Sequence, residues 1–415
     1  MLRTLCLMML LCLELSASVS AQEIQRGTLK SLDLEQKKIV ITSGGKDREF
    51  SLTDKTDVLG ETGKNLSEKL KDFAAGTEIF FKPKAADSQE LVGIKRVTAR
   101  DNPAGAARPG NSGRPVSPDT KSLKPLTELG AAKYQNFEGG FYPGGKNERP
   151  TEHEAAGLKL ARQVQPLNAS GKPDSQGKVV LLSVGMSNTS QSSQGFEAEL
   201  RGSTKKHPQL QFVNGAQGGM TAAVIQSTDD GRGATYWATV DQRLQQAGVT
   251  RDQVQVVWIK QADAGPSSGF PKYAQTLQAE LQRIVQLISK RFPNCRLAYL
   301  SSRTYGGYAT TSLNPEPYAY ESGFSVKWLI ESQLSGAAEL NFDATKGPVQ
   351  APWLSWGPYL WANGSTPRAD GFSYDVTDFV ADGTHQSNSG QRKVGKLMLD
   401  FFESDSTTKS WFTAR

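Results

Sequence analysis

The 415-residue sequence predicts two folded units, a small all-β domain followed by a larger α/β domain with a parallel sheet. In the larger of these units, apolar runs typical of strands buried on both faces alternate with segments whose apolar residues recur every three or four positions. The strand-like runs lie at 178–184, 209–214, 253–260 and 295–301, and the clearest helical patterns at 273–288 and 394–402. This order favours a sheet with helices on both sides, in which sites form at the carboxyl ends of the strands.

Residues 22–100 predict a small β-barrel or sandwich, because apolar and polar residues alternate along strand-like runs, and Gly and Asp occur between these runs. A short helix is predicted at 66–73, with Asn65 as its N-cap. The segment resembles the small β-barrel modules that recur in exported bacterial proteins. That resemblance implies binding or placement, at an envelope or glycan surface, and no chemistry of its own.

The remaining segments set the predicted boundaries. Residues 1–21 combine Arg3, an apolar run and small residues before position 22, which is typical of a cleavable secretory signal. Residues 101–128 are rich in Pro, Gly, Ala and Ser and predict a flexible linker. A loop-rich lead-in at 129–174 precedes the α/β domain at 175–405. No later apolar stretch reaches the ~18 residues of a transmembrane helix, so a secreted or periplasmic protein is expected.

Composition excludes several function classes. The formal charge of +6 is spread along the chain, so no nucleic acid partner is expected. Removal of the signal takes away Cys6 and Cys12 and leaves Cys295 in a predicted strand, where it is expected to be structural. His153 lacks metal-ligand spacing and is expected on the surface. We therefore expect neither a metal nor an organic cofactor.

Ser187 follows the first strand of the α/β domain within Gly185-Met186-Ser187-Asn188. A serine in this turn would lie at the carboxyl edge of the sheet and at a helix N-terminus, where backbone N–H groups stabilise an oxyanion. Serine in such a place is also a common turn or helix-cap residue, so the tetrapeptide alone leaves both interpretations open.

Asp382 and His385 form a second motif, Asp382-Gly383-Thr384-His385, just ahead of the last helical pattern. An aspartate three residues before a histidine can bond one imidazole nitrogen and leave the other to take a proton from serine. The alternative is that both residues cap local structure. A strand-Gly-x-Ser start and an Asp-x-x-His end together favour a catalytic triad of Ser187, His385 and Asp382.

These motifs resemble those of the SGNH/GDSL hydrolase superfamily, in the branch of carbohydrate O-acetylesterases where Asn follows the nucleophile. The resemblance covers about residues 175–405. It implies a flavodoxin-like three-layer α/β/α sandwich with Ser187 as nucleophile, His385 as base and Asp382 as its orienting acid. It also implies an oxyanion hole that begins with the Ser187 N–H group.

The other oxyanion donors come from two further blocks in this family. The loop after the second strand contains Gly218 and Gly219, either of which matches the family glycine, and Gly218 is preferred. The third block departs from the family, since residues 260–263 read Lys-Gln-Ala-Asp where most members carry an asparagine donor. Gln261 offers a side-chain amide in its place, and Asn188 is the other amide considered.

Aromatic residues suggest a substrate surface. Trp356 and Trp361 lie in a loop rich in Pro and Gly, and Tyr305 belongs to a segment, 303–308, that follows a strand end. Aromatic faces in a cleft stack on sugar rings, although core or lid packing explains the same residues.

The sequence thus predicts a secreted serine esterase, a hydrolase that deacetylates a carbohydrate or another small ester. The alternative is a catalytically degenerate SGNH-fold protein that binds a glycan or a protein partner, which the unusual third block favours.

Overall fold

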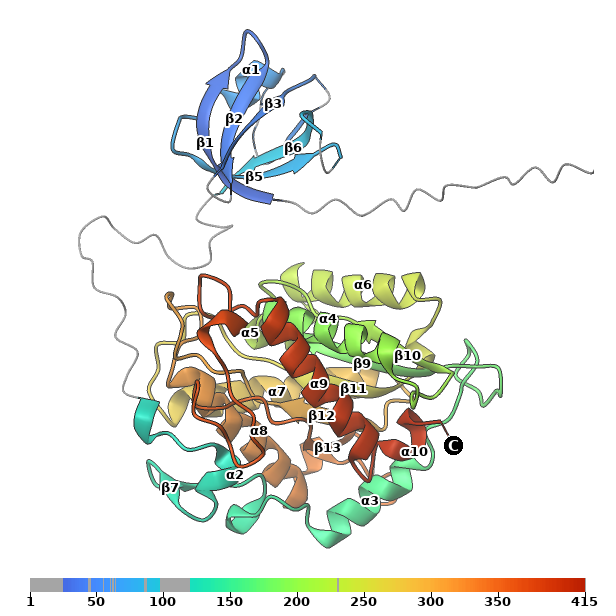
Figure 1. Cartoon of the computed structure of the whole chain (residues 1–415). Coiled ribbons are helices and arrows are strands. Elements are labelled where there is room, and N and C mark those ends of the chain that lie inside the picture. The colour runs from blue at the N-terminus through green and yellow to red at the C-terminus, as the bar shows by residue number, and fades with distance from the viewer. Residues whose placement is uncertain are drawn as a thin grey trace, which may run out of the picture. The chain divides into compact units, whose positions relative to one another are not determined.

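The computed structural model describes residues 25–43, 46–54, 56–59, 61, 63, 65–85, 88–97, 120–229 and 231–414 (Figure 1). The chain divides into two compact units, with the division between Ala106 and Ala107. The predicted signal at 1–21 and the part of the predicted linker before residue 120 lie outside the described residues. Within the described part of the chain, no helix combines the length and the apolar character needed to cross a membrane.

The first unit is built on one six-stranded sheet in the order β3-β2-β1-β5-β6-β4. Its elements are β1 (Gln25–Asp33), β2 (Lys38–Ser43), β3 (Lys46–Ser51), β4 (Asp57–Leu59), α1 (Leu66–Leu70), β5 (Glu78–Pro83) and β6 (Leu91–Arg96). Alternate side chains of β2 and β5 are buried, as the period-two pattern predicts. Asn65 caps α1 by accepting a hydrogen bond from the Glu68 N–H at 2.9 Å. The predicted all-β unit and its short helix are therefore present.

The second unit is organised around a five-stranded, fully parallel sheet in the order β10-β9-β11-β12-β13. Its strands are β9 (Val179–Gly185), β10 (Leu210–Asn214), β11 (Val254–Lys260), β12 (Leu297–Ser301) and β13 (Trp353–Trp356). All residues of β9 and β11 are buried, which explains their continuous apolar runs. Four of the five strands coincide with the predicted runs.

Helices connect these strands or follow the last of them, and they cover the sheet (Figure 1). They are α4 (Ser187–Gly202), α5 (Ala222–Ile225), α6 (Gly231–Gln246), α7 (Lys272–Arg291), α8 (Tyr318–Leu334), α9 (Asn388–Ser404) and α10 (Lys409–Phe412). One group contains α4, α9 and α10, and the other contains α5 to α8. The strand order reverses at β9, so right-handed crossovers place the two groups on opposite faces.

Helices α4 and α9 touch backbone to backbone. A Cβ atom added to Gly395 would lie 2.3 Å from the carbonyl carbon of Gly195, and one added to Gly195 would lie 1.9 Å from the carbonyl oxygen of Gln391. Because any side chain at this crossing would push the helices apart, the two glycines fix how closely the middle of α9 approaches the middle of α4.

The second unit is larger than the predicted range 175–405. Residues 120–128, predicted as linker, contain a 3-10 turn and the start of α2 (Leu126–Leu129), and Leu126 is fully buried. The lead-in contains β7 (Lys133–Tyr134), β8 (Phe137–Glu138) and α3 (Thr151–Ala161), and α10 lies beyond residue 405.

His153 is buried and not on the surface as predicted, because its ring stacks on Trp353 and its Nε2 lies 2.8 Å from the Leu354 carbonyl oxygen. Cys295 is buried and unpaired, and burial raises the pKa of its thiol to about 12. An inert, structural Cys295 agrees with expectation.

Candidate active site

Ser187 is the first residue of α4 and stands at the carboxyl end of β9. The chain turns sharply because Met186 is extended (φ −104°, ψ −164°) and its carbonyl accepts the first two helical hydrogen bonds, from Thr189 and Ser190. Gly185 permits the turn, since a Cβ atom there would lie 2.3 Å from the Lys260 carbonyl oxygen. The serine hydroxyl is thus presented at a helix N-terminus, where free N–H groups and the helix dipole favour negative charge.

Asp382 and His385 lie on a tight turn immediately before α9. Oδ1 of Asp382 accepts hydrogen bonds from the N–H groups of Thr384 (2.8 Å) and His385 (2.9 Å), and Oδ2 lies 2.6 Å from Nδ1 of His385. Gly383 allows this turn, because it has φ +65° and an added Cβ would overlap the Tyr308 carbonyl at 1.8 Å. The carboxylate is therefore held rigidly against the imidazole.

The two motifs meet although 198 positions separate them, and Oγ of Ser187 lies 2.8 Å from Nε2 of His385. Burial alone would raise the pKa of Asp382, but the hydrogen bonds from the His385 ring and from the backbone outweigh it and lower the pKa to about 2. Since an ionised carboxylate only accepts hydrogen bonds, Nδ1 carries the proton and Nε2 faces the hydroxyl as acceptor.

A small cavity of about 10 Å³, called the Ser187 cavity below, lies beside these groups. Its lining consists of Met186, Ser187, Asn188, Asp263, Ala264, Arg303, Leu313, Asn314, Thr384 and His385. A Cβ atom added to Gly218 would lie 3.9 Å from that of Ser187, so of the two candidate glycines Gly218 adjoins the nucleophile. Among the described residues, neither the Ser187 nor the Gly218 N–H has a protein acceptor. Two backbone donors therefore remain free beside the hydroxyl.

Asn188 does not offer the free amide that the sequence suggested. Its Nδ2 donates to the Thr384 carbonyl at 2.8 Å, and its Oδ1 accepts a hydrogen bond from Nζ of Lys260. Lys260 is buried, and burial, followed by the charge of Arg303, lowers its pKa well below the usual value. Asn188 thereby ties the start of α4 to the end of β11 and to the turn that carries His385.

Gln261 is also bound elsewhere, which corrects its expected role as an oxyanion donor. Its Nε2 donates to the Met220 carbonyl at 2.8 Å, its Oε1 accepts from the Ala262 N–H at 3.1 Å, and it is absent from the lining of the Ser187 cavity. The side chain braces the loop after β10, because the chain leaving β11 directs the amide toward that loop.

The aromatic residues predicted to bind substrate are buried. Trp361 is 0% exposed and its indole N–H donates to Glu316 at 2.7 Å. Tyr305 is 7% exposed and its hydroxyl hydrogen bonds to Thr120 at 3.1 Å. Trp356 is 2% exposed. Core packing therefore replaces the predicted stacking surface, because the Trp361 ring packs against Tyr305 and Tyr320 and the Trp356 ring packs against Phe141.

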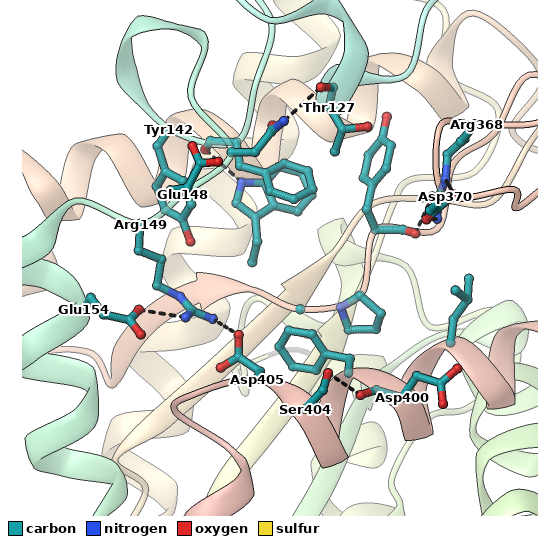
Figure 2. Close-up of a pocket in the computed structure, with 18 residues that line it drawn as sticks. Thr127, Tyr142, Glu148, Arg149, Glu154, Arg368, Asp370, Asp400, Ser404 and Asp405 are labelled. Carbon is teal, nitrogen blue, oxygen red and sulfur yellow. Dashed lines mark hydrogen bonds and ion pairs between the residues drawn. The ribbon is translucent and has the colours of Figure 1, made fainter.

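Trp356 lines a separate cavity of about 660 Å³, called the Trp356 cavity below (Figure 2). The indole is stacked on Phe141, with ring centroids 4.5 Å apart, and its N–H donates to the Phe141 carbonyl. Figure 2 shows the Arg149 side chain between Glu154 and Asp405, to which it is ion-paired at 2.8 and 2.6 Å. The lining residues of the two cavities do not overlap.

Several lining residues were not assigned a role from the sequence. Asp263 and Asn314 face the Ser187 cavity from the loops after β11 and β12, and so does Arg303, from the segment 303–308 that follows a strand end. Their signal in the sequence is that polar residues follow buried strands at their carboxyl ends. The described residues contain no group of three or more His, Cys, Asp or Glu arranged to hold a metal ion.

No family model and no curated protein matches the chain. Among solved structures it is similar to a protein from Slackia heliotrinireducens provisionally described as an SGNH hydrolase (15% identity, 54% of this chain, 99% of that chain, TM-score 0.29). It is also similar to the periplasmic domain of a lipopolysaccharide acetyltransferase from Salmonella ser. Paratyphi A (13%, 60%, 95%, 0.30). A third match is apo-CusF from Escherichia coli (19%, 20%, 98%, 0.15). Such distant matches assign neither an activity nor a ligand to this chain.

Proposed function

We propose that the second unit is a serine ester hydrolase of the SGNH/GDSL type with a flavodoxin-like sandwich. The observation that carries the proposal is the continuous hydrogen-bonded chain from Ser187 through His385 to Asp382, with distances of 2.8 and 2.6 Å. Nucleophile, base and orienting acid are the minimum set for acyl transfer to serine.

The reaction follows from the geometry. Oγ of Ser187 adds to the ester carbonyl carbon while its proton passes to Nε2 of His385, and the displaced electron pair moves onto the carbonyl oxygen. The N–H groups of Ser187 and Gly218 stabilise that oxygen. The imidazolium then protonates the alcohol oxygen as its bond to the acyl carbon breaks. Water, activated by the same imidazole, releases the acid.

The proposed substrate is an acetyl ester, with an acetylated carbohydrate as the natural form. A cavity of about 10 Å³ has room for little more than one small group beside the hydroxyl, which favours a short acyl chain. The carbohydrate part rests on the resemblance of the motifs to O-acetylesterases. The signal-like N-terminal sequence supports secretion or export to the periplasm.

The test is a Ser187→Ala variant assayed with p-nitrophenyl acetate, with Ser190→Ala as the matched control on the same helix. We expect the first to lose activity by about 10⁴-fold or more and the second to stay within twofold of wild type. A fluorophosphonate probe should label wild type and not Ser187→Ala. Full activity in the Ser187→Ala variant would end the proposal.

The alternative is a non-catalytic scaffold that binds a glycan or a partner. Gln261 favours it, because that amide is bound to Met220 and leaves the family's third donor position empty. Wild type that is never labelled by the fluorophosphonate, at any pH, would support the binding protein.

The first unit is proposed to place the enzyme at an envelope or glycan surface. The division of the chain into two compact units supports a separable role. Deletion of residues 22–100 is expected to change localisation and to leave esterase activity intact, whereas loss of both would assign the first unit to catalysis or folding.

A further inference from the structure

Arg303 is a buried cation in the wall of the Ser187 cavity that the triad does not use. It lies just beyond the end of β12 and is 2% exposed. Its Nε donates to Oδ1 of Asn314 at 3.1 Å, and Asn314 is itself held by the Asp263 carbonyl (3.1 Å) and the Tyr273 hydroxyl (3.2 Å). The guanidinium group is therefore fixed before any substrate arrives.

The terminal nitrogens of Arg303 have no partner within the part of the chain that the structure describes. No carboxylate there forms an ion pair with them, and no hydrogen bond uses them. These nitrogens are also not among the fully inaccessible side-chain atoms that lack a hydrogen-bond partner, so they retain some access to the cavity. A buried guanidinium normally lies against a carboxylate, because the removal of an isolated charge from water is unfavourable. Its free donors therefore point to a negative charge that arrives from outside the fold.

The carboxylates around Arg303 accept hydrogen bonds from other groups, and none forms an ion pair with it. The Glu316 carboxylate accepts hydrogen bonds from two backbone N–H groups and from Trp361. Asp382 is bound to His385. Asp263, which faces the same cavity, accepts from the Ala223 N–H. Burial, followed by the charge of Arg303, lowers the pKa of Lys260 well below its usual value, so the neutral amine is favoured there. An ester oxygen that becomes negative next to Asp263 needs a cation, and Arg303 is the cation in the lining.

We propose that the Arg303 guanidinium donates a hydrogen bond to the ester carbonyl oxygen as Ser187 adds to it, and so provides the third donor of the oxyanion hole. The inference rests on the proposed esterase function. Electrons balance without a further reactant, since the carbonyl electron pair moves to oxygen, the hydroxyl proton moves to His385, and Arg303 keeps its protons throughout. The residue thereby takes the place that Gln261 leaves empty.

The experiment compares Arg303→Met, Arg303→Lys and Arg303→Ala in the full chain with p-nitrophenyl acetate. Loss of one oxyanion donor typically lowers kcat by about 100- to 1000-fold, so Arg303→Met should fall in that range with KM nearly unchanged. Arg303→Lys should lose at least about tenfold, because one ammonium cannot reach both Asn314 and the oxyanion. Guanidinium ion added to Arg303→Ala should restore part of kcat.

The matched control is Arg149→Met, which removes a partly buried arginine that is ion-paired and lines the Trp356 cavity. This variant should lose stability and keep its kcat. If Arg303→Met and Arg303→Ala do not fold, Arg303→Lys decides alone. A folded Arg303→Lys or Arg303→Met with wild-type kcat overturns the inference and leaves the esterase intact, whereas wild type without activity or probe labelling overturns both.

Discussion

The Ser187 cavity has a volume of about 10 Å³ and the Trp356 cavity about 660 Å³, yet the groups suited to chemistry surround the smaller one. Around the larger cavity, Arg149 pairs with Glu154 and Asp405, and Arg368 pairs with Asp370. Around the smaller one, a hydroxyl faces an imidazole, and the N–H groups of Ser187 and Gly218 have no acceptor in the described part of the protein. Groups that satisfy one another stabilise a fold, whereas groups left ready for a substrate mark a site.

Of the variants that compare the two cavities, Asp382→Asn is expected to lose the most esterase activity. The asparagine amide can donate toward Nδ1 and so favours the tautomer in which Nε2 carries the proton, which removes the general base. Activity on p-nitrophenyl acetate should fall by about 10³- to 10⁴-fold. Asp375→Asn is the control, because Asp375 caps a 3-10 turn by accepting from Thr377 and asparagine performs the same task. Equal losses in both variants would contradict the triad.

A smaller loss is expected from Gly395→Ala, which acts at a distance. The new Cβ would meet the Gly195 backbone at 2.3 Å, so α9 must move away from α4 and carry His385 from Ser187. A displacement of this kind costs activity by about 100-fold. Gly202→Ala on α4 is the control, since nothing lies within 4 Å of its added Cβ. Unchanged kcat in a folded Gly395→Ala would show that the crossing does not set the triad distance.

The parallel strands and the Asp382 turn could be predicted because their signals are local. Continuous apolar runs reflect burial on both faces, and Asp-x-x-His closes its own hydrogen bonds within four residues. The crossing at Gly195 and Gly395 brings together residues that are 200 positions apart, so no local sequence pattern predicts it. Burial of Trp361, Tyr305 and His153 likewise depends on distant segments.

The prediction that Gln261 is the third oxyanion donor was wrong for a related reason. Gln261 has suitable chemistry and a suitable place in the sequence, but its orientation is set by Met220 on another loop. Arg303 follows a strand end, as the sequence shows, while its lack of an ion-pair partner in the described chain depends on the Glu316 and Asp382 carboxylates being bound to other groups. Residue type and spacing identify candidates, whereas hydrogen-bond accounting in three dimensions selects among them.

The low pKa of Asp382 predicts a moderate effect of pH on stability. Its folded pKa of about 2 lies below the usual value of 3.8, so its contribution is present above about pH 4 and is lost as the pH falls toward 2. Wild type should exceed Asp382→Asn in the free energy of unfolding by about 1–2 kcal/mol near pH 6, and the difference should shrink below pH 4. Urea unfolding from pH 6 to about 2.5 measures it. A difference that stays constant with pH would contradict the shifted carboxylate.

The smallest effect on catalysis is expected from Trp356→Phe. The substitution removes the hydrogen bond to the Phe141 carbonyl and part of the packing around the Trp356 cavity, which should lower the free energy of unfolding by about 1–2 kcal/mol. Because this cavity shares no lining residue with the Ser187 cavity, kcat and kcat/KM on both p-nitrophenyl acetate and an acetylated oligosaccharide should stay within twofold of wild type. A selective loss of kcat/KM on the oligosaccharide would instead indicate that the Trp356 cavity binds the sugar part of a substrate whose ester reacts at Ser187.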